Sequence, residues 1–315
     1  MNLLASLRYL VALSEHRHFA RAAEACHITQ PALSNALRAL EQEFGTPIVR
    51  RGRTFAGLTE EGERILLTAR RMLHEHELLQ QELHGSADQP QGSLRLGVIP
   101  TALPIAARFA AALQARHPGI VPQLRSLSSP EIEAGLQDLT LDLGLGFAER
   151  LAAQPGRFDL LPQYEERYFL LRRRADLETL TVGASCSWKE AAAQPLCLLS
   201  PEMHHRQIVQ AAFAEAGVAV KPAMETNSVL ALVLAVAGGS LAAVVPGALV
   251  AAAPGGLGLE ALPLVRPAVA TSVVFITLAR SAPSRTLQAA LRLAQGADWL
   301  RDAQAHAGRL ASFKR

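Results

Sequence analysis

The sequence predicts two fold classes in one chain: a helical N-terminal region, followed by a larger α/β region. Apolar residues recur at helical spacing through residues 1–84, whereas strand-like and helix-like segments alternate from residue 94 onward. Between these regions, the segment GSADQPQGS has the composition of a linker. With 315 residues, half of them hydrophobic, the chain is long enough for two or three domains with substantial cores.

These patterns divide the chain into four parts. Residues 1–58 form a helical domain that ends in a short basic hairpin, VRRGRTFAGL, and residues 59–84 form one long helix. Residues 85–93 form a hinge linker, and residues 94–315 form an α/β domain with two lobes. The lobe boundaries are predicted at about 94–161 and 268–315 for lobe I, and about 162–267 for lobe II.

Two short helices joined by a tight turn are predicted in the N-terminal domain. The first, at residues 19–26, turns the small residues Ala22, Ala23 and Cys26 inward, which permits a close helix crossing. Thr29 caps the next helix, and Pro31 lies in its first turn, where no intrahelical N–H bond is lost. The expected core stripe of this second helix consists of Leu33, Leu37, Leu40 and Phe44.

The opposite side of the second helix is polar. Gln30, Ser34 and Arg38 follow one another at intervals of four residues, with Pro31 and Asn35 beside them. A helix that packs in a core has little use for such a face, whereas a recognition helix contacts bases in the DNA major groove from its N-terminal end. The pattern therefore predicts a helix-turn-helix. The alternative is a three-helix bundle with a solvated polar face. Positive charge for phosphate contacts is expected from Arg38, Arg50, Arg51 and Arg53.

The long helix at residues 59–84 carries the pattern of a short coiled coil. Thr59 is a good N-cap, and the acidic residues Glu60 and Glu61 follow it where the helix dipole favours them. The seam predicts dimerisation, and packing of the helix against its own chain is the alternative. The seam residues are Ala69, Met72, Leu79 and Leu83, with His76 between them.

The α/β region contains two similar halves. Each begins with a strand, a loop and a helix, in LRLGVIPTALPIAARFAAAL and again in PLCLLSPEMHHRQIVQAAFAEAG. Each then continues with a short strand and a polar loop that opens another helix. Helix N-termini bind anions through free N–H groups, so convergence of four such starts predicts a ligand cleft between the lobes, although each polar residue alone is also an ordinary N-cap. The candidate cleft residues are Pro100, Thr101, Ser128, Ser129, Met203, His204, Arg206 and Asn227.

Several other classes of protein fit the sequence poorly. The uncharged stretch within residues 226–259 is long enough to cross a bilayer, but Gly238, Gly239 and Pro246 divide it into a helix, a strand and a second helix. The three cysteines lie far apart, and the N-terminus lacks the features of a signal peptide, so a cytoplasmic protein without disulfides is expected.

Adjacent histidines on a helix point apart, which argues against a metal site at His204 and His205. The common nucleophile, nucleotide and zinc-protease motifs are missing, so an enzyme is not expected.

The segments AAEACHITQPALS and LTEEGERIL give the chain a resemblance to LysR-type transcriptional regulators. The resemblance implies a winged helix-turn-helix, a linker helix and a two-lobed effector domain like that of periplasmic binding proteins. It also implies double-stranded promoter DNA as the partner, a homodimer that pairs into a homotetramer, and RNA polymerase as a further candidate partner. This chain has His18 and Ala20 where the family often has Ser and Thr, and Asn35 where relatives often have a basic residue or a longer amide.

The resemblance further implies which residues act. Gln30, Pro31, Ser34, Asn35 and Arg38 would read DNA, while Arg50, Arg51 and Arg53 would serve the wing. The segment LLSPEMHHRQIV is similar to the branch that contains cyanate-operon and formate-dehydrogenase-operon regulators, which implies a small anion such as formate or cyanate as the inducer and no enzymatic cofactor. The alternative function is a cytoplasmic α/β enzyme or ligand-binding protein that acts on a small anion without binding DNA.

Overall fold

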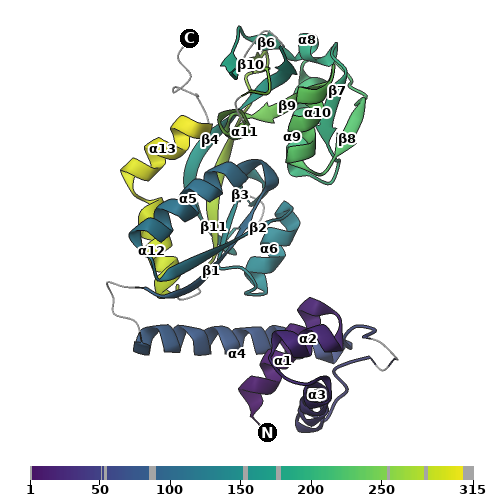
Figure 1. Ribbon diagram of the computed structural model, residues 1–315, viewed down its shortest axis with the longest axis vertical. Helices are drawn as coiled ribbons and strands as arrows, with labels where there is room; N and C mark the ends of the chain where they lie inside the picture. The colour runs from purple at the N-terminus through teal and green to yellow at the C-terminus, as the bar shows by residue number, and fades with distance from the viewer. Residues whose placement is uncertain are drawn as a thin grey trace. The chain divides into compact units, whose positions relative to one another are not determined.

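A computed structural model describes the chain at residues 2–50, 52, 55–84, 90–151, 155–174, 179–253, 256–279 and 283–307. Its residues group into two units (Figure 1). The N-terminal unit contains residues 1–88 together with 138–140, and the C-terminal unit contains residues 89–137 and 141–315.

Three helices form the body of the N-terminal unit: α1 (Leu3–His16), α2 (Phe19–Ala25) and α3 (Gln30–Phe44). Each begins with a side-chain cap. Asn2 caps α1, His18 Nδ1 accepts from Arg21 N at 3.5 Å at the start of α2, and Thr29 Oγ1 accepts from Ala32 N at 3.4 Å at the start of α3. Histidine at position 18 therefore fills the place of the hydroxyl residue that the family often has.

The core of this unit contains most of the apolar residues that the sequence predicts there. Leu33, Leu37 and Leu40 are buried, as are Ala22 and Ala23 on the facing helix. The prediction for the last residue of the stripe is wrong, because Phe44 is 45% exposed at the end of α3. The stripe closes one turn earlier, since the chain leaves the helix at Gly45 in the left-handed conformation.

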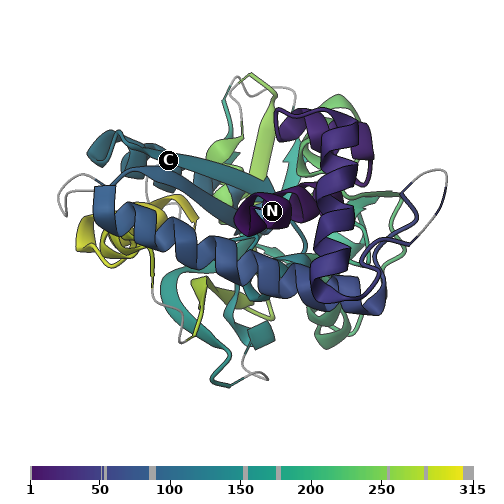
Figure 2. The same ribbon diagram turned by 90° about the horizontal axis from the view of Figure 1, so that it is seen from below.

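The linker helix α4 (Glu60–His84) begins where the sequence predicts. Thr59 Oγ1 accepts from Gly62 N at 2.9 Å, and a Cβ at Gly62 would collide with the Ile48 carbonyl oxygen, so glycine permits the close approach. Leu66 and Ala69 belong to the core of the unit. Beyond them α4 extends past α1–α3, as the blue helix in Figure 2 shows.

The first lobe of the C-terminal unit is a mixed sheet of three parallel strands, one antiparallel strand and then a fifth strand that runs in the direction of the first three. The parallel strands stand in the order β2–β1–β3, and β11 joins β3 to the first part of β4. The elements of this lobe are β1 (Gly92–Val98), η1 (Pro100–Ala102), α5 (Leu103–Arg116), β2 (Ile120–Ser126), α6 (Ser129–Gln137), β3 (Leu143–Phe147), α7 (Ala148–Leu151), β11 (Ala270–Leu278), α12 (Arg285–Ala294) and α13 (Ala297–Ala307).

The second lobe repeats this arrangement. Its parallel strands stand in the order β8–β7–β9, and β9 is antiparallel to the second part of β4. Its elements are β5 (Thr181–Val182), β6 (Cys186–Ser187), α8 (Trp188–Ala192), β7 (Leu196–Leu199), α9 (His204–Glu215), β8 (Met224–Thr226), α10 (Val229–Gly238), β9 (Ala242–Pro246), α11 (Gly247–Ala252) and β10 (Leu259–Val265). The predicted internal repeat is therefore present as two lobes with the same strand order.

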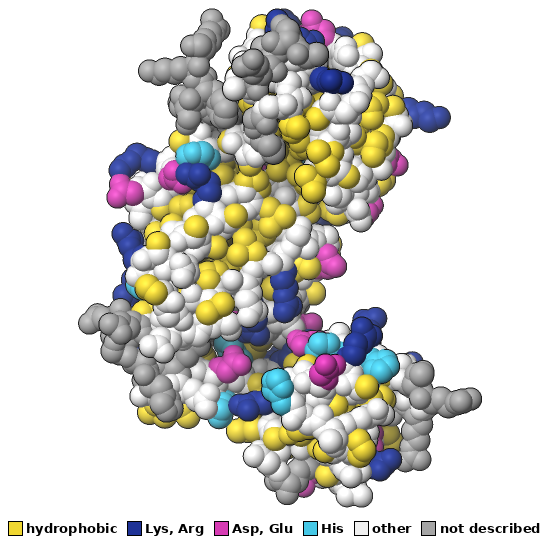
Figure 3. Space-filling model, viewed as in Figure 1, with side chains coloured by type: hydrophobic (Ala, Val, Ile, Leu, Met, Phe, Trp, Pro, Cys, Tyr) yellow, Lys and Arg dark blue, Asp and Glu magenta, His cyan; other side chains and the backbone are white. Residues whose placement is uncertain are grey.

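The strand β4 (Phe158–Arg173) runs through both lobes. It pairs with β11 as far as Arg167 and with β9 from Tyr168 onward, so the lobe boundary falls later than the predicted one at residue 162. Hydrophobic side chains gather along the middle of this unit in Figure 3, and charged ones lie mostly at its margins.

The apolar stretch within residues 226–259 folds as a helix, a strand and a helix, namely α10, β9 and α11. In the part of the chain that the structure describes, no helix combines the length and the apolar character needed to cross a membrane.

Candidate functional site

Helix α3 presents a polar row on the side opposite its buried leucines. Gln30, Pro31, Asn35 and Arg38 are exposed, and Ser34 is half-buried. The Arg38 guanidinium donates to Asn35 Oδ1 at 3.3 Å. The N-terminal half of α3 therefore offers amide, hydroxyl and guanidinium groups to solvent, which is the mixture of donors and acceptors that recognises base edges in a major groove.

The base of the predicted wing is fixed to α3 by one carboxylate. Glu41 Oε1 accepts from the backbone N–H groups of Ile48 at 2.8 Å and Val49 at 3.1 Å. Val49 in turn pairs with Leu58 in an antiparallel bridge. Because Glu41 belongs to α3, this contact sets where the wing leaves the helix, and the recognition helix and the wing become one surface.

One of the predicted wing arginines, Arg50, lies next to the polar row of α3. Arg50 is exposed, and a pocket between α3 and the start of the wing is lined by Ser34, Arg38 and Arg50. Arg51 and Arg53 lie outside the described residues. The described arginines place positive charge beside the exposed row, where DNA phosphates would pass.

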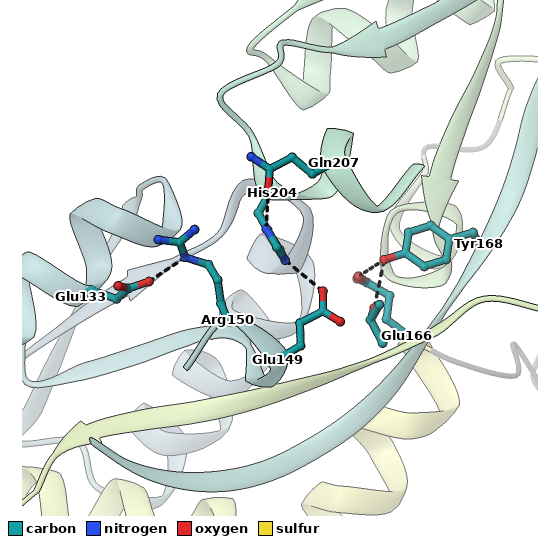
Figure 4. Close-up of polar contacts among 8 residues, drawn as sticks. Glu133, Glu149, Arg150, Glu166, Tyr168, His204 and Gln207 are labelled. Carbon is teal, nitrogen blue, oxygen red and sulfur yellow. Dashed lines mark hydrogen bonds and ion pairs between the residues drawn. The ribbon is translucent and has the colours of Figure 1, made fainter. Parts of the chain in front are cut away.

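In the C-terminal unit, the two lobes meet at His204, the first residue of α9. Its Nε2 lies 2.9 Å from Glu149 Oε1 on α7 of the other lobe, and its Nδ1 lies 3.1 Å from Gln207 Oε1 (Figure 4). The His204 ring also packs on Phe147, with the ring centroids 5.1 Å apart. We name the region around these contacts the lobe junction. His204, one of the predicted cleft residues, therefore joins the two lobes directly.

A second group of polar side chains is buried where β4 passes between the lobes. Tyr168 Oη lies 2.9 Å from Thr271 Oγ1 and 3.5 Å from Glu166 Oε2. Glu166 is fully buried, and this desolvation raises the pKa of Glu166 to about 8, since its hydrogen bond from Tyr168 offsets only part of the burial cost. The Tyr168 ring packs on His205 with the centroids 5.6 Å apart, and burial lowers the pKa of His205 to about 4.

The cations near the lobe junction already have partners. Arg206 is buried, and its Nη1 donates to Glu225 Oε1 at 2.7 Å and to the Leu199 carbonyl at 2.8 Å. Arg150 Nε donates to Glu133 Oε1 at 2.6 Å. Arg206 is a predicted anion contact, but in the structure its charge is held in an ion pair within lobe II, and losing that partner would leave a buried charge unpaired.

Two predicted hydroxyl residues of lobe I are buried at the start of helices. Thr101 Oγ1 in η1 and Ser129 Oγ in α6 have no hydrogen-bond partner among the described residues. Both follow the carboxyl ends of neighbouring parallel strands, β1 and β2, where ligands of open α/β sheets bind. Ser128 is different, since its hydroxyl and backbone N–H both donate to Glu131 Oε2. Glu131, on the first turn of α6, therefore holds both polar groups of Ser128 at the start of the helix.

The remaining predicted cleft residues have other surroundings. Met203 packs against the core of lobe II formed by β7, β9 and α10, and Pro100 is half-buried in η1. Asn227 is exposed beside Ser228, the residue that caps α10. The structure thus places His204 at the lobe junction and Thr101 and Ser129 at buried helix starts, whereas Met203 packs in lobe II and Ser128 is held by Glu131.

Sequence reasoning missed the polar residues of β4. Tyr164, Glu166 and Tyr168 are buried and alternate with the exposed Glu165 and Arg167. The segment YEERY contains this alternation, and a glutamate on the apolar side of a strand was the available signal. Glu149 gave no such signal, because its contact with His204 joins residues far apart in the chain.

In the part of the chain that the structure describes, no group of three or more His, Cys, Asp or Glu residues is placed to hold a metal ion.

A winged helix-turn-helix in the same chain as a two-lobed α/β domain is the architecture of a bacterial regulator with an effector domain. Residues 87–298 match the family model described as the LysR substrate binding domain. Residues 4–63 match the model described as bacterial regulatory helix-turn-helix protein, lysR family. Because the first match covers more than half of the chain, the chain belongs to the LysR family.

Individual relatives are more distant. The SDS degradation transcriptional activation protein of a Pseudomonas species is 37% identical over 49% of this chain and 51% of its own. A hydrogen peroxide-inducible genes activator of Escherichia coli is 41% identical over 31% of this chain and 32% of its own. These matches thus span about half and about a third of the relatives' lengths. A full-length OxyR variant from Pseudomonas aeruginosa has a similar fold, with 22% identity, a TM-score of 0.71 and coverage of 97% of each chain.

Proposed function

We propose that the protein is a transcriptional regulator that acts in the cytoplasm by binding promoter DNA through α3 and the wing. The observation that carries this proposal is the exposed row of Gln30, Asn35 and Arg38 on α3, with Arg50 of the wing beside it. Bidentate contacts from amide and guanidinium groups specify bases, while the arginines contact phosphates.

Fluorescence anisotropy with a DNA fragment from directly upstream of its own gene tests this proposal. Gln30→Ala is expected to weaken specific binding by about 1–3 kcal/mol, because a base contact is lost. Gln42→Ala is the matched control, since Gln42 is exposed near the other end of the same helix. Equal affinities of wild type and Gln30→Ala for the promoter would show that α3 does not read DNA in this way.

We infer that α4 forms the dimer seam and that such dimers pair into tetramers. Three seam residues lie exposed in a single chain: Met72 is 41% exposed, Leu79 52% and Leu83 70%. Their spacing of seven and four residues places them on one side of α4, where a second copy would cover them. Ala69 is different, because it packs in the core of its own unit and is unavailable to a partner.

Analytical ultracentrifugation tests the seam. Met72→Asp with Leu79→Asp is expected to reduce the assembly to protomers, because unpaired charges would have to be buried between the helices. Arg71→Asp introduces the same side chain on α4 at an exposed position off the row and is expected to leave the assembly intact. An unchanged sedimentation coefficient in the double variant would show that another surface holds the protomers together.

We propose that a small-molecule inducer binds at the lobe junction. The observation behind this site is the direct contact of the lobes through His204 and Glu149. In lobe I, the buried hydroxyls of Thr101 and Ser129 at neighbouring helix starts have no hydrogen-bond partner among the described residues. A ligand that binds one arrangement of the lobes better than another shifts the population toward it, and this shift alters promoter binding. We propose RNA polymerase as the partner whose recruitment to the promoter such a change would alter.

Thermal-shift titration of the full-length protein with n-butylamine, n-butyrate and n-butanol tests the position of the site. Stabilisation by at least one probe is expected, reduced in Thr101→Val and altered in His204→Ala, because the latter removes the present partner of Glu149. Thr101→Val keeps the side-chain volume and removes only the hydroxyl. Full stabilisation of both variants would place the ligand elsewhere, and no stabilisation of the wild type by any probe would count against a junction site.

A further inference from the structure

The charges around the lobe junction favour a cationic ligand. Glu166 has no cationic partner in the part of the chain that the structure describes, and Glu149 has only His204. The two nearby guanidinium groups, by contrast, are held by carboxylates, Arg206 by Glu225 and Arg150 by Glu133. Because the guanidinium groups nearby are already neutralised, a formate or cyanate ion would find no unpaired guanidinium at the junction among the described residues. An ammonium group, by contrast, would find two carboxyl groups that can accept its N–H bonds.

Several buried polar atoms beside these carboxylates have no partner among the described residues. Glu166 Oε1, Tyr164 Oη and both ring nitrogens of His205 have no hydrogen-bond partner among the described residues, and all three side chains are more than nine-tenths buried. Buried polar groups are normally paired, because an unpaired one loses its hydration without compensation. A ligand that brings N–H donors would satisfy the Glu166 carboxylate at this place.

The groups that would surround such a ligand come from three elements. Figure 4 shows Glu149 on α7, His204 on α9 and Glu166 with Tyr168 on β4, and the carboxylates of Glu149 and Glu166 point toward the space between His204 and Tyr168. The phenol of Tyr168 is affected by both carboxylates: burial raises the pKa of Tyr168, and the charges of Glu166 and Glu149 raise it further. The rings of Tyr168 and Phe147 add faces that attract cations.

We propose that the lobe junction binds a small organic cation, whose ammonium or amidinium N–H groups lie between the carboxylates of Glu149 and Glu166. The proposal rests on the proposed inducer site and names the chemical class of its ligand. The ligand N–H groups replace His204 at Glu149, so binding breaks the hydrogen bond that joins α7 to α9. Occupancy therefore selects a different arrangement of the two lobes from the one in which His204 and Glu149 are joined.

Binding of a cation also couples to the protonation of Glu166. The charge of Glu166 acts on the titratable groups of Tyr164 and Tyr168 on β4. His205 on α9 packs on Tyr168, and Glu149 on α7, which is paired with His204 on α9, also acts on Tyr168. Burial raises the pKa of Glu166 to about 8, so its carboxyl is protonated in the free protein at neutral pH. The bound cation stabilises the carboxylate, and a proton is released on binding. Affinity for the cation is therefore expected to rise about tenfold per pH unit between about pH 6 and pH 8.

Isothermal titration calorimetry of the full-length protein with n-butylamine and benzylamine, against n-butyrate, benzoate, formate and cyanate, tests the ligand class. At least one amine is expected to bind, with affinity that rises with pH, and the carboxylates and cyanate are expected not to bind. Binding of an anion in place of both amines, or no binding of either amine, overturns the proposal.

Glu166→Gln separates the charge of the carboxyl from its shape. This variant is expected to weaken amine binding at pH 8 at least tenfold and to remove the pH dependence, whereas Glu215→Gln, at the exposed end of α9, changes neither. Promoter anisotropy is measured on the same preparations. Intact promoter binding without amine binding refutes the ligand class alone, and loss of promoter binding in the wild type refutes the proposed regulator.

Discussion

The recognition helix and the lobe junction place their polar side chains in opposite ways. The candidate DNA contacts of α3 all lie on one helix and are exposed or half-buried. Arg38 donates a hydrogen bond to Asn35, three residues earlier on the same helix. At the lobe junction the residues come from α7, β4, α9 and β11, and Glu166 and His205 are buried. A surface carried by one helix needs only the correct spacing, whereas a surface built from four elements needs the folded domain around it.

The two sites also differ in the free energy that an unpaired charge costs the free protein. Exposed arginines of α3 and the wing keep their hydration until DNA arrives, so they cost little in the free protein. A buried carboxyl such as Glu166 keeps its proton at neutral pH, because the charged form would lose its hydration without a partner. The exposed site is therefore ready to bind a polyanion, while the buried site couples binding to protonation. The following experiments test this contrast.

Leu33→Ala is expected to have the largest effect on the N-terminal unit. Leu33 is fully buried beneath α3, so truncation should destabilise the unit by about 2–5 kcal/mol through lost burial and a cavity. Phe44→Ala is the matched change on the same helix and should cost far less, because Phe44 is 45% exposed. Thermal denaturation followed by circular dichroism measures both, and a larger loss in Phe44→Ala would place the core stripe where the sequence alone put it.

Glu166→Gln is expected to change how stability depends on pH. Burial raises the pKa of Glu166 to about 8 in the native protein, while the unfolded chain ionises it near its usual value, so folding takes up a proton between about pH 4.5 and pH 8. Wild-type stability therefore falls as pH rises through this range, and the variant lacks that loss. Relative to wild type, the variant should gain about 3 kcal/mol between pH 5 and pH 7. Urea denaturation at a series of pH values checks this, and a difference that stays constant with pH would contradict it.

Thr29→Ala is expected to have a moderate effect. Thr29 Oγ1 accepts from Ala32 N at the start of α3, and loss of this cap should cost about 1 kcal/mol. Thr29→Ser keeps the acceptor and should stay close to wild type. The free energy of unfolding in urea measures both variants, and equal losses in Ala and Ser would attribute the effect to the methyl group.

Replacement of the cysteines is expected to have the smallest effect. Burial raises the pKa of Cys26, Cys186 and Cys197, and the reactive form of a cysteine is the thiolate, so we expect none of the three thiols to respond to peroxide. Promoter affinity of the wild type should change by less than about twofold after brief treatment with hydrogen peroxide. A larger change that the Cys26→Ser, Cys186→Ser and Cys197→Ser variant abolishes would reveal a thiol switch.

Much of the fold could be predicted from the sequence because its cause is local. Thr29 and Pro31 begin α3, Thr59 begins α4, and the glycines and Pro246 divide the apolar stretch into α10, β9 and α11. The repeated order of strand, helix, strand and helix predicted two similar lobes. The position of the lobe boundary on β4 was harder to predict from the sequence, because it depends on which strands pair with β4 before and after Tyr168.

The chemistry of the lobe junction depended on partners that spacing does not reveal. Arg206 is a candidate anion contact in the sequence, but the fold brings it to Glu225 and the Leu199 carbonyl. The sequence by itself determined the helix-turn-helix with its polar row, because helical periodicity specifies both faces of α3. Only the tertiary structure decided which charges remain free, because hydrogen bonds between distant residues pair the arginines and burial isolates Glu166 from water.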